Sequence, residues 1–162
     1  MALQGLARQE LRRDLPATLE AVEEFFGEVR VWMLAHQVPG HFAMELLIRE
    51  ALTNAVVHGC QCDPSKRVAC ILRARAGRVT IAVRDQGAGF DWRSARPGLP
   101  APGACSGRGL AIFREYADRV RFNRRGNSLV LIDRFSGEAS NRPAGPAQVS
   151  TGQVTPDKEP ND

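Results

Sequence analysis

The sequence has 162 residues, of which 43% are hydrophobic and 25% charged, and its formal net charge is +4 at pH 7. This length and composition are those of one soluble globular domain, and no run approaches the ~18 apolar residues of a membrane span. The arginines are spread along the chain without an aromatic-interleaved basic run, and residues 1–10 lack the apolar segment of a signal peptide. We therefore expect a cytoplasmic protein that binds neither nucleic acid nor a membrane.

The N-terminal part of the chain predicts two helices. Residues 6–14 suit either an edge strand or a short helix. Pro16 fits the first turn of a helix, and apolar residues then recur with a helical period to about Ala35. After a break at Val38-Pro39-Gly40, a second helix is predicted from about His41 to His58, with Gly59 as its C-terminal stop.

Two hairpins and one more helix are predicted in the rest of the chain. The runs 68–76 and 78–85 have β-like character and meet at Ala76-Gly77, which predicts a hairpin. A third helix is predicted over 109–117, and a second hairpin is predicted from 120–123 and 128–134. Between the first hairpin and the third helix, residues 91–108 carry several glycines and prolines, which is typical of a functional lid or a disordered loop.

This order of elements predicts an α+β fold, a two-layer α/β sandwich in which a mixed, mostly antiparallel sheet carries helices on one face. We place this domain at residues 1–135. Residues 136–162 are rich in Ser, Gly, Pro, Ala and charges, so we predict a disordered C-terminal tail.

Four cysteines are present, and two of them, Cys60 and Cys62, follow His58 closely. This cluster raises a metal site as an alternative. Its spacing is tighter than that of a structural zinc knuckle, and no second pair follows it. We expect ordinary reduced thiols, since nothing in the sequence indicates secretion.

The second predicted helix carries polar residues in an unexpected place. Glu50, Asn54 and His58 recur every four residues and form one stripe on a helix that is otherwise mostly apolar. Buried carboxylate and amide groups need partners or a ligand to offset desolvation. Two explanations stay open at this point: these groups belong to a functional site, or they are satisfied by core neighbours or lie on a solvated edge.

Two glycine-containing motifs come later in the chain. In Asp85-x-Gly87-x-Gly89, a strand ends on a carboxylate and two glycines follow that allow close approach of the backbone. In the segment 107–110, a glycine-flanked arginine stands at a helix start, where free N–H groups favour phosphate. Each motif alone is weak, and their order and spacing on a helix, a strand end and a helix start are more specific.

At these residues the chain resembles a known family. The segments E-A-L-T-N-A-V-V-H-G, D-Q-G-A-G-F and G-R-G-L-A-I-F resemble the nucleotide-binding boxes of the GHKL (Bergerat-fold) ATP-binding superfamily. The compact size and the ending Y-A-D-R-V-R-F-x-x-x-G-N-S-L-V-L are similar to anti-sigma-factor serine/threonine kinases of the RsbW and SpoIIAB type. The resemblance covers about residues 10–134.

The resemblance implies a role for each matching residue. Asn54 matches the asparagine that holds Mg²⁺. Glu50 matches the catalytic carboxylate that orients or deprotonates the attacking hydroxyl. Asp85 matches the aspartate that accepts a hydrogen bond from the adenine amino group of ATP.

The glycine-containing motifs also have counterparts in the family. Gly87 and Gly89 match glycines that line the base and sugar. The phosphate-side box is matched by Gly107, Arg108, Gly109 and Leu110, and residues 91–106 would form the ATP lid. His58 stands at a frequent histidine position, and we interpret it as a structural residue or one that supports the ligand-contacting residues, rather than as a phosphoacceptor. The chain departs from the family at Asn127, where threonine often follows the glycine of the last hairpin.

The resemblance further implies partners. The expected substrate is an anti-sigma-factor antagonist of the STAS type, with a sigma factor as a second possible partner, and family members commonly form homodimers through the sheet edge near the N-terminus. In the alternative function, the protein binds nucleotide and sequesters a regulator without significant transfer. In a third, less favoured alternative, the domain is the catalytic half of a histidine kinase, but neither His36 nor His41 begins a phosphoacceptor-like pattern.

Overall fold

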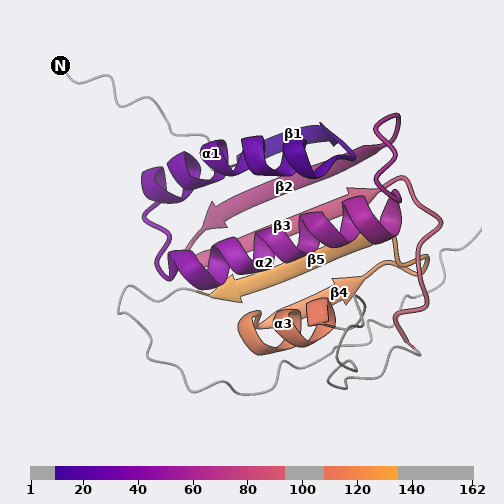
Figure 1. The fold of residues 1–162 in the computed structure, drawn as a ribbon. Coiled ribbons are helices and arrows are strands. Elements are labelled where there is room, and N and C mark those ends of the chain that lie inside the picture. The colour runs from indigo at the N-terminus through magenta and orange to yellow at the C-terminus, as the bar shows by residue number, and fades with distance from the viewer. Residues whose placement is uncertain (1–9, 94–107, 135–162) are drawn as a thin grey trace, which may run out of the picture.

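The computed structural model describes residues 10–93 and 108–134, and it has two layers, a β-sheet and a layer of helices (Figure 1). The predicted tail at 136–162, most of the predicted lid with its Cys105, and Gly107 of the predicted phosphate-side box lie outside the described residues. Five strands form one sheet in the order β1-β2-β3-β5-β4, and each neighbouring pair is antiparallel. Their bounds are β1 Glu10–Pro16, β2 Arg67–Arg75, β3 Arg78–Asp85, β4 Arg119–Phe122 and β5 Ser128–Arg134.

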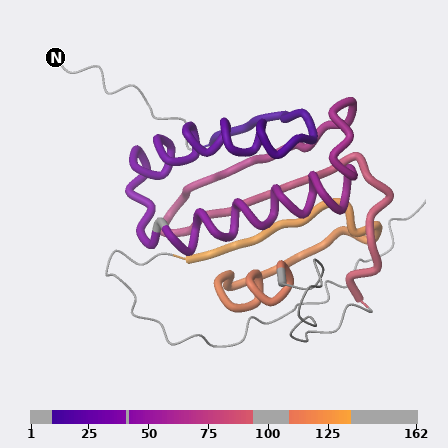
Figure 2. The backbone as a smooth tube through the Cα atoms, in the orientation of Figure 1, coloured from indigo at the N-terminus to yellow at the C-terminus, as the bar shows by residue number. Residues whose placement is uncertain are grey.

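The three α-helices lie on the same face of this sheet (Figures 1 and 2). Helix α1 (Leu19–Ala35) packs near β1, α2 (His41–Asn54) crosses the middle of the sheet near β3, and α3 (Arg108–Tyr116) lies beside α2 and β4. The predicted α+β sandwich with helices on one face is confirmed. Among the described residues, none of the helices combines the length and the apolar character that crossing a bilayer requires.

The strand sequences explain which face of the sheet meets the helices. In β2, Val68, Cys70 and Leu72 are buried while the residues between them are partly or fully exposed, and β3 repeats this alternation at Val79, Ile81 and Val83. Successive side chains of a strand point to opposite faces, so one face is committed to the core. The core also includes Phe25 and Phe26 of α1 and Leu47, Ile48 and Leu52 of α2.

The first helix begins later than the sequence predicts. Pro16 ends β1 rather than starting α1, and Thr18 is the N-cap, where its Oγ1 accepts a hydrogen bond from the backbone N–H of Ala21 at 3.2 Å. Proline is compatible with a strand at the sheet edge, because its missing N–H is not needed there. The ambiguous N-terminal segment is thus an edge strand from Glu10 onward.

The second helix begins at His41 as predicted, but its last turn is not α-helical. Residues Ala55–Gly59 form a π-helical turn, η1, in which the N–H of Cys60 donates to the carbonyl of Ala55 at 2.8 Å. Such wider turns occur inside helices and often lie at functional sites. The turn carries Gly59 to the C-terminal end of β3.

Candidate functional site

The site begins with Glu50 and Asn54 on α2. The two residues are one helical turn apart and partly buried, and the Nδ2 amide group of Asn54 donates a hydrogen bond to Oε1 of Glu50 at 3.4 Å. They lie on the same stripe of α2 because they are four residues apart, while the apolar residues of this helix pack into the core. This hydrogen bond uses the amide nitrogen of Asn54. The side-chain carbonyl oxygen of Asn54 takes no part in it.

Gly109 brings the start of α3 against these two side chains. A Cβ at Gly109 would lie 2.3 Å from Nδ2 of Asn54 and 2.9 Å from Oε1 of Glu50. Both distances are far below van der Waals contact, so any side chain at this position would displace the Asn54 amide or the Glu50 carboxylate. The first N–H groups of a helix have no partner within it and sit at the positive end of the helix dipole. A carboxylate, an amide and a helix N-terminus therefore meet here.

A second group of contacts surrounds Asp85 at the end of β3. Its Oδ1 accepts a hydrogen bond from the backbone N–H of Gly87 at 2.7 Å. A Cβ at Gly59 would lie 2.5 Å from Cγ of Asp85, and a Cβ at Gly87 would lie 2.0 Å from the carbonyl oxygen of Gly59. Two glycines thus allow the end of η1 to touch the carboxylate and the loop after it.

The environment of Asp85 is unfavourable to its negative charge. Burial raises the pKa of Asp85, and the hydrogen bond from Gly87 and the more distant charges of Arg125 and Lys66 oppose this rise only in part. A partly buried carboxylate of this kind gains from an additional hydrogen-bond donor. A ligand that carries an amino group would supply one.

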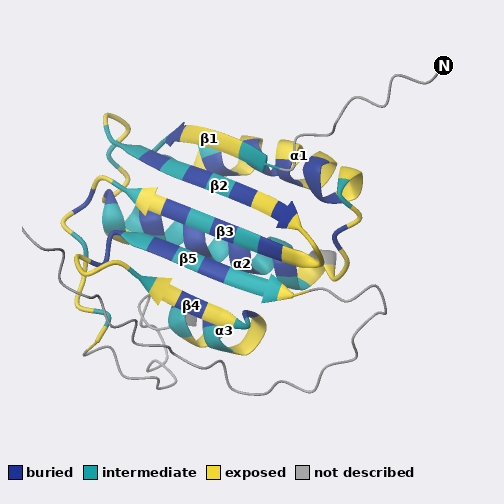
Figure 3. Ribbon diagram, turned by 180° about the vertical axis from the view of Figure 1, so that it is seen from behind, coloured by how far each residue is buried: buried dark blue, intermediate teal, exposed yellow. Residues whose placement is uncertain are grey.

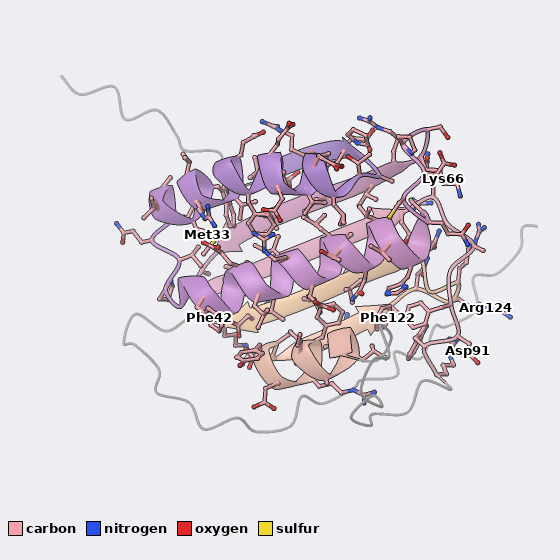
Figure 4. All side chains as sticks on the ribbon, viewed as in Figure 1. Met33, Phe42, Lys66, Asp91, Phe122 and Arg124 are labelled. Carbon is pink, nitrogen blue, oxygen red and sulfur yellow. The ribbon has the colours of Figure 1, made fainter. Side chains whose placement is uncertain are left out.

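The two groups of contacts belong to one region of the molecule. Asn54 and Gly59 are on the same continuous helical segment, because the π-helical turn η1 follows α2 directly. Glu50 and Asp85 therefore lie at the same end of α2 rather than on opposite sides of the fold. This end, with Lys66 and Arg124 close by, is seen in Figure 4.

Asn127 supports the site in a way that the sequence did not reveal. Its side chain is only 7% exposed, its Nδ2 donates to the carbonyl of Asp85 at 3.2 Å, and its Oδ1 accepts from Nδ2 of Asn123 at 2.8 Å. Its backbone carbonyl accepts the N–H of Asp85 at 3.0 Å. The only signal of this role in the sequence is the amide side chain at position 127, where the resemblance leads one to expect threonine.

Gly89 packs against the turn between β4 and β5. It has a φ of +83°, and a Cβ there would lie 1.9 Å from the carbonyl oxygen of Arg125. The Arg125 guanidinium donates from Nε to the carbonyl of Ala88 at 3.1 Å. These contacts require a glycine at position 89 whether or not it also lines a ligand.

An aromatic cluster flanks this loop. Phe122 meets Phe90 edge to face at 5.3 Å between ring centroids and stacks with Trp92 at 5.7 Å. Nε1 of Trp92 donates to the carbonyl of Asn123 at 2.9 Å. Figure 4 shows Phe122 near Asp91 and Arg124, where β4 ends and the loop after β3 runs. These contacts hold the loop after β3 against the end of β4 as far as Trp92.

The remaining predicted positions divide into three cases. Leu110 is partly buried and packs against the hydrophobic core. Arg108 begins α3, but its side chain, like all of Gly107, lies outside what the structure describes. His58 is exposed, which does not support the structural role expected for it.

The cysteines have separate environments. Cys60 is buried, Cys62 is exposed, and burial raises the pKa of the Cys70 thiol to about 12, which keeps it protonated at neutral pH. Among residues 10–93 and 108–134, the structure groups no three His, Cys, Asp or Glu side chains in a way that would hold a metal ion. A magnesium ion held chiefly through ATP needs few protein ligands, so this observation bears on the zinc alternative alone.

A comparison with family models decides the identity of the domain. The model for the histidine kinase-like ATPase domain matches residues 15–132, which include both groups of contacts. The chain belongs to this family. A search of curated proteins found no match to the chain. Membership makes this histidine kinase-like ATPase domain an ATP-binding domain and confirms the superfamily part of the resemblance, while the anti-sigma kinase branch stays a prediction.

Proposed function

We propose that this histidine kinase-like ATPase domain is a serine/threonine protein kinase that acts as an anti-sigma factor and phosphorylates a STAS-type antagonist. The observation that carries the proposal is the meeting of Glu50, Asn54 and the N-terminus of α3 at Gly109. It places a carboxylate beside the part of the fold best suited to hold phosphate groups.

The residues present fit ATP with Mg²⁺. Glycine at position 109 leaves room for the start of α3 to approach Asn54, and the carbonyl oxygen of Asn54 is the kind of ligand that Mg²⁺ prefers. When bound, ATP supplies the phosphoryl group and Mg²⁺ neutralises its charge. Asp85 accepts a hydrogen bond from the adenine amino group, which offsets the burial of its carboxylate.

Glu50 has the role of general base in this proposal. Its carboxylate accepts the proton of the attacking serine or threonine hydroxyl of the partner protein, which requires direct hydrogen-bond reach. The hydrogen bond from Nδ2 of Asn54 orients the carboxylate. Phosphoryl transfer depends mostly on positioning and charge stabilisation, so these few groups are chemically sufficient.

The test combines nucleotide binding with phosphate transfer. The full chain is mixed with Mg²⁺-ATP and with purified STAS proteins from the same genome, and phosphate on the partner is detected by mass spectrometry. We expect Glu50→Gln to lower transfer by about 10²-fold or more while ATP binding is retained, and Asn54→Ala to weaken Mg²⁺-ATP binding. Glu45→Gln, which changes a carboxylate of the same helix that pairs with Arg30, is the matched control.

Each contrary result has a definite meaning. Transfer by Glu50→Gln at the wild-type rate would remove Glu50 from the role of base. ATP binding without transfer to any STAS protein would favour the alternative function, a nucleotide-binding module that sequesters a sigma factor. Phosphate on a histidine of the chain itself would favour the histidine kinase alternative.

We also propose that the kinase is a homodimer formed through the β1 edge of the sheet. β1 is a terminal strand of the described sheet, and a groove of about 890 Å³ runs between it and α1, with Val31 on its rim 68% exposed. A sheet edge beside an exposed apolar side chain such as Val31 is suited to pairing with a second copy. Sedimentation of the wild type and of Val31→Glu tests this, and a monomeric wild type would contradict it.

A further inference from the structure

The face of the sheet that points away from the helices is rich in arginine. Residues paired across antiparallel strands lie on the same face, so the register identifies the side chains that share this outward face. Figure 3 shows this face, and no described helix covers it. Its arginines come from all five strands and are Arg12, Arg67, Arg73, Arg75, Arg78, Arg84, Arg119, Arg121 and Arg134.

This face holds more positive charge than the whole chain. Its nine arginines and two carboxylates, Glu10 and Asp14, give it a formal charge of +7, against +4 for the entire sequence, so all other residues together carry −3. Arginines of β1 and β2 pair with both carboxylates. β3, β4 and β5 contribute arginines and no acidic side chain to this face. The excess of positive charge of this chain is therefore concentrated on the outward face of the sheet.

The middle of the same surface is apolar. Ile71, Ala82 and Val130 are aligned across three neighbouring strands, and Ile132 lies beside Thr80 in the next row. All five are partly exposed, and arginines lie at both ends of these rows. We call this surface, with its apolar middle and its nine arginines, the arginine-rimmed face.

We propose that the arginine-rimmed face is a docking surface for a partner protein that presents acidic side chains around an apolar centre. Protein interfaces have an apolar core and a polar rim, and arginine is enriched in them. Complementary charge steers association and selects the partner. The proposal does not depend on the kinase function, because the nucleotide site lies at α2 and α3, on the other side of the sheet.

Two other occupants fit this surface less well. Proteins that bind single-stranded nucleic acid on a sheet use aromatic side chains for stacking, and the described residues of this face include no aromatic one. A second copy of the chain would bring two faces of charge +7 together, which like-charge repulsion opposes. Neither objection applies to an acidic protein with an apolar centre.

The test uses a fluorescent synthetic peptide that forms an amphipathic helix, with leucines along one side bordered by glutamates. Its binding to the full-length protein is measured by fluorescence anisotropy. We expect the double variant Arg78→Glu/Arg121→Glu to weaken binding by about tenfold or more, and Ile71→Ser to weaken it without any change in charge. The peptide should bind more tightly than poly-glutamate, because the apolar middle contributes.

The matched control is Arg30→Glu/Arg114→Glu, which makes the same change in charge on two helices. It should leave peptide binding within about twofold of the wild type at moderate salt, where charges more than ~10 Å apart are screened. Mg²⁺-ATP affinity should be unchanged in the Arg78/Arg121 variant, and circular dichroism checks that each variant is folded.

Four results would overturn the proposal. The first is equal peptide binding by wild type and Arg78→Glu/Arg121→Glu. The second is tighter binding of a short DNA duplex than of the peptide, which would identify nucleic acid as the occupant. The third is preferential binding to phosphatidylglycerol vesicles. The fourth is self-association of the wild type that the Arg78/Arg121 change abolishes.

Discussion

Close packing explains why position 109 of this fold is a glycine. The start of α3 approaches Glu50 and Asn54 so closely that the smallest side chain would overlap the Asn54 amide. Gly27 of α1 offers a contrast, since a Cβ there would meet nothing within 4 Å. The same residue type is thus required by packing in one helix and merely tolerated in another.

We predict that Gly109→Ala weakens Mg²⁺-ATP binding. The added methyl displaces the Asn54 side chain, and overpacking of this kind costs about 1–3 kcal/mol, which corresponds to roughly tenfold or more in affinity. Isothermal titration calorimetry measures the loss. The control Gly27→Ala should bind ATP like the wild type and unfold at a higher temperature, because alanine in a helix is favoured over glycine by about 0.5–1 kcal/mol. Equal ATP affinity in Gly109→Ala would show that the contact is not part of the site.

Asp85 predicts a pH dependence of stability. Burial raises its pKa above the ordinary value of 3.8, so the folded state holds this proton more tightly than the unfolded chain. The resulting stabilisation is fully present below that ordinary value and is lost as pH rises through the raised pKa. We therefore expect the melting temperature of Asp85→Asn, relative to the wild type, to increase as pH rises from the ordinary pKa of 3.8 through the raised pKa.

The same variant should bind ATP more weakly, although the amide oxygen that it introduces can still accept the Gly87 N–H. Asp63→Asn is a contrast of opposite sign, because hydrogen bonds from Ser65 lower the pKa of Asp63. Its stabilisation is present above the ordinary pKa and lost as pH falls. The melting temperature of Asp63→Asn relative to the wild type should thus decrease as pH rises. Parallel pH profiles for the two variants would contradict the assignment.

The turn between β4 and β5 holds the end of β3 in place. Asn123 accepts on Oδ1 from the backbone N–H groups of Gly126, Asn127 and Ser128, and Asn127 continues the network to the backbone of Asp85. Because β3 and β5 are neighbours in the sheet, this turn lies directly beside the carboxylate. The turn therefore has two roles, closing the second hairpin and positioning Asp85.

We predict that Asn127→Ala destabilises the protein by about 1–3 kcal/mol, since it leaves buried hydrogen-bonding groups without partners. ATP affinity should also fall, because Asp85 loses its support. Arg124→Ala, an exposed position in the same turn, is the control and should stay within about 0.5 kcal/mol of the wild type. Chemical denaturation measures both changes, and an Asn127→Ala variant as stable as the control would refute the network.

Across the whole molecule, the sheet separates two surfaces of different chemistry. The helices and the proposed ATP site lie on one side, and the arginine-rimmed face lies on the other. A partner docked on the outward face would leave the nucleotide site accessible. This arrangement would allow the proposed kinase to hold one protein while it acts on another.

Much of this architecture follows from local patterns. Alternation with a period of two predicted β3 at its observed bounds, and β5 likewise runs from Ser128 to Arg134 as predicted. The helical period and Gly59 placed the second helix correctly, because burial of one stripe and a stop residue are properties of neighbouring positions. Pro16 was misassigned, since proline suits both a first helical turn and an edge strand.

The π-helical turn, the hydrogen bond from Asn127 to Asp85 and the gathering of arginines on one face were not evident from local patterns. Asp85 and Asn127 are 42 residues apart, and the nine arginines become neighbours only when five strands pair in register. The period of the apolar residues indicates which side of each helix or strand is buried, because this pattern is set by residues that are close in the sequence. Contacts between distant segments depend on how the buried sides pack together, and for this reason the folded chain alone assembles them.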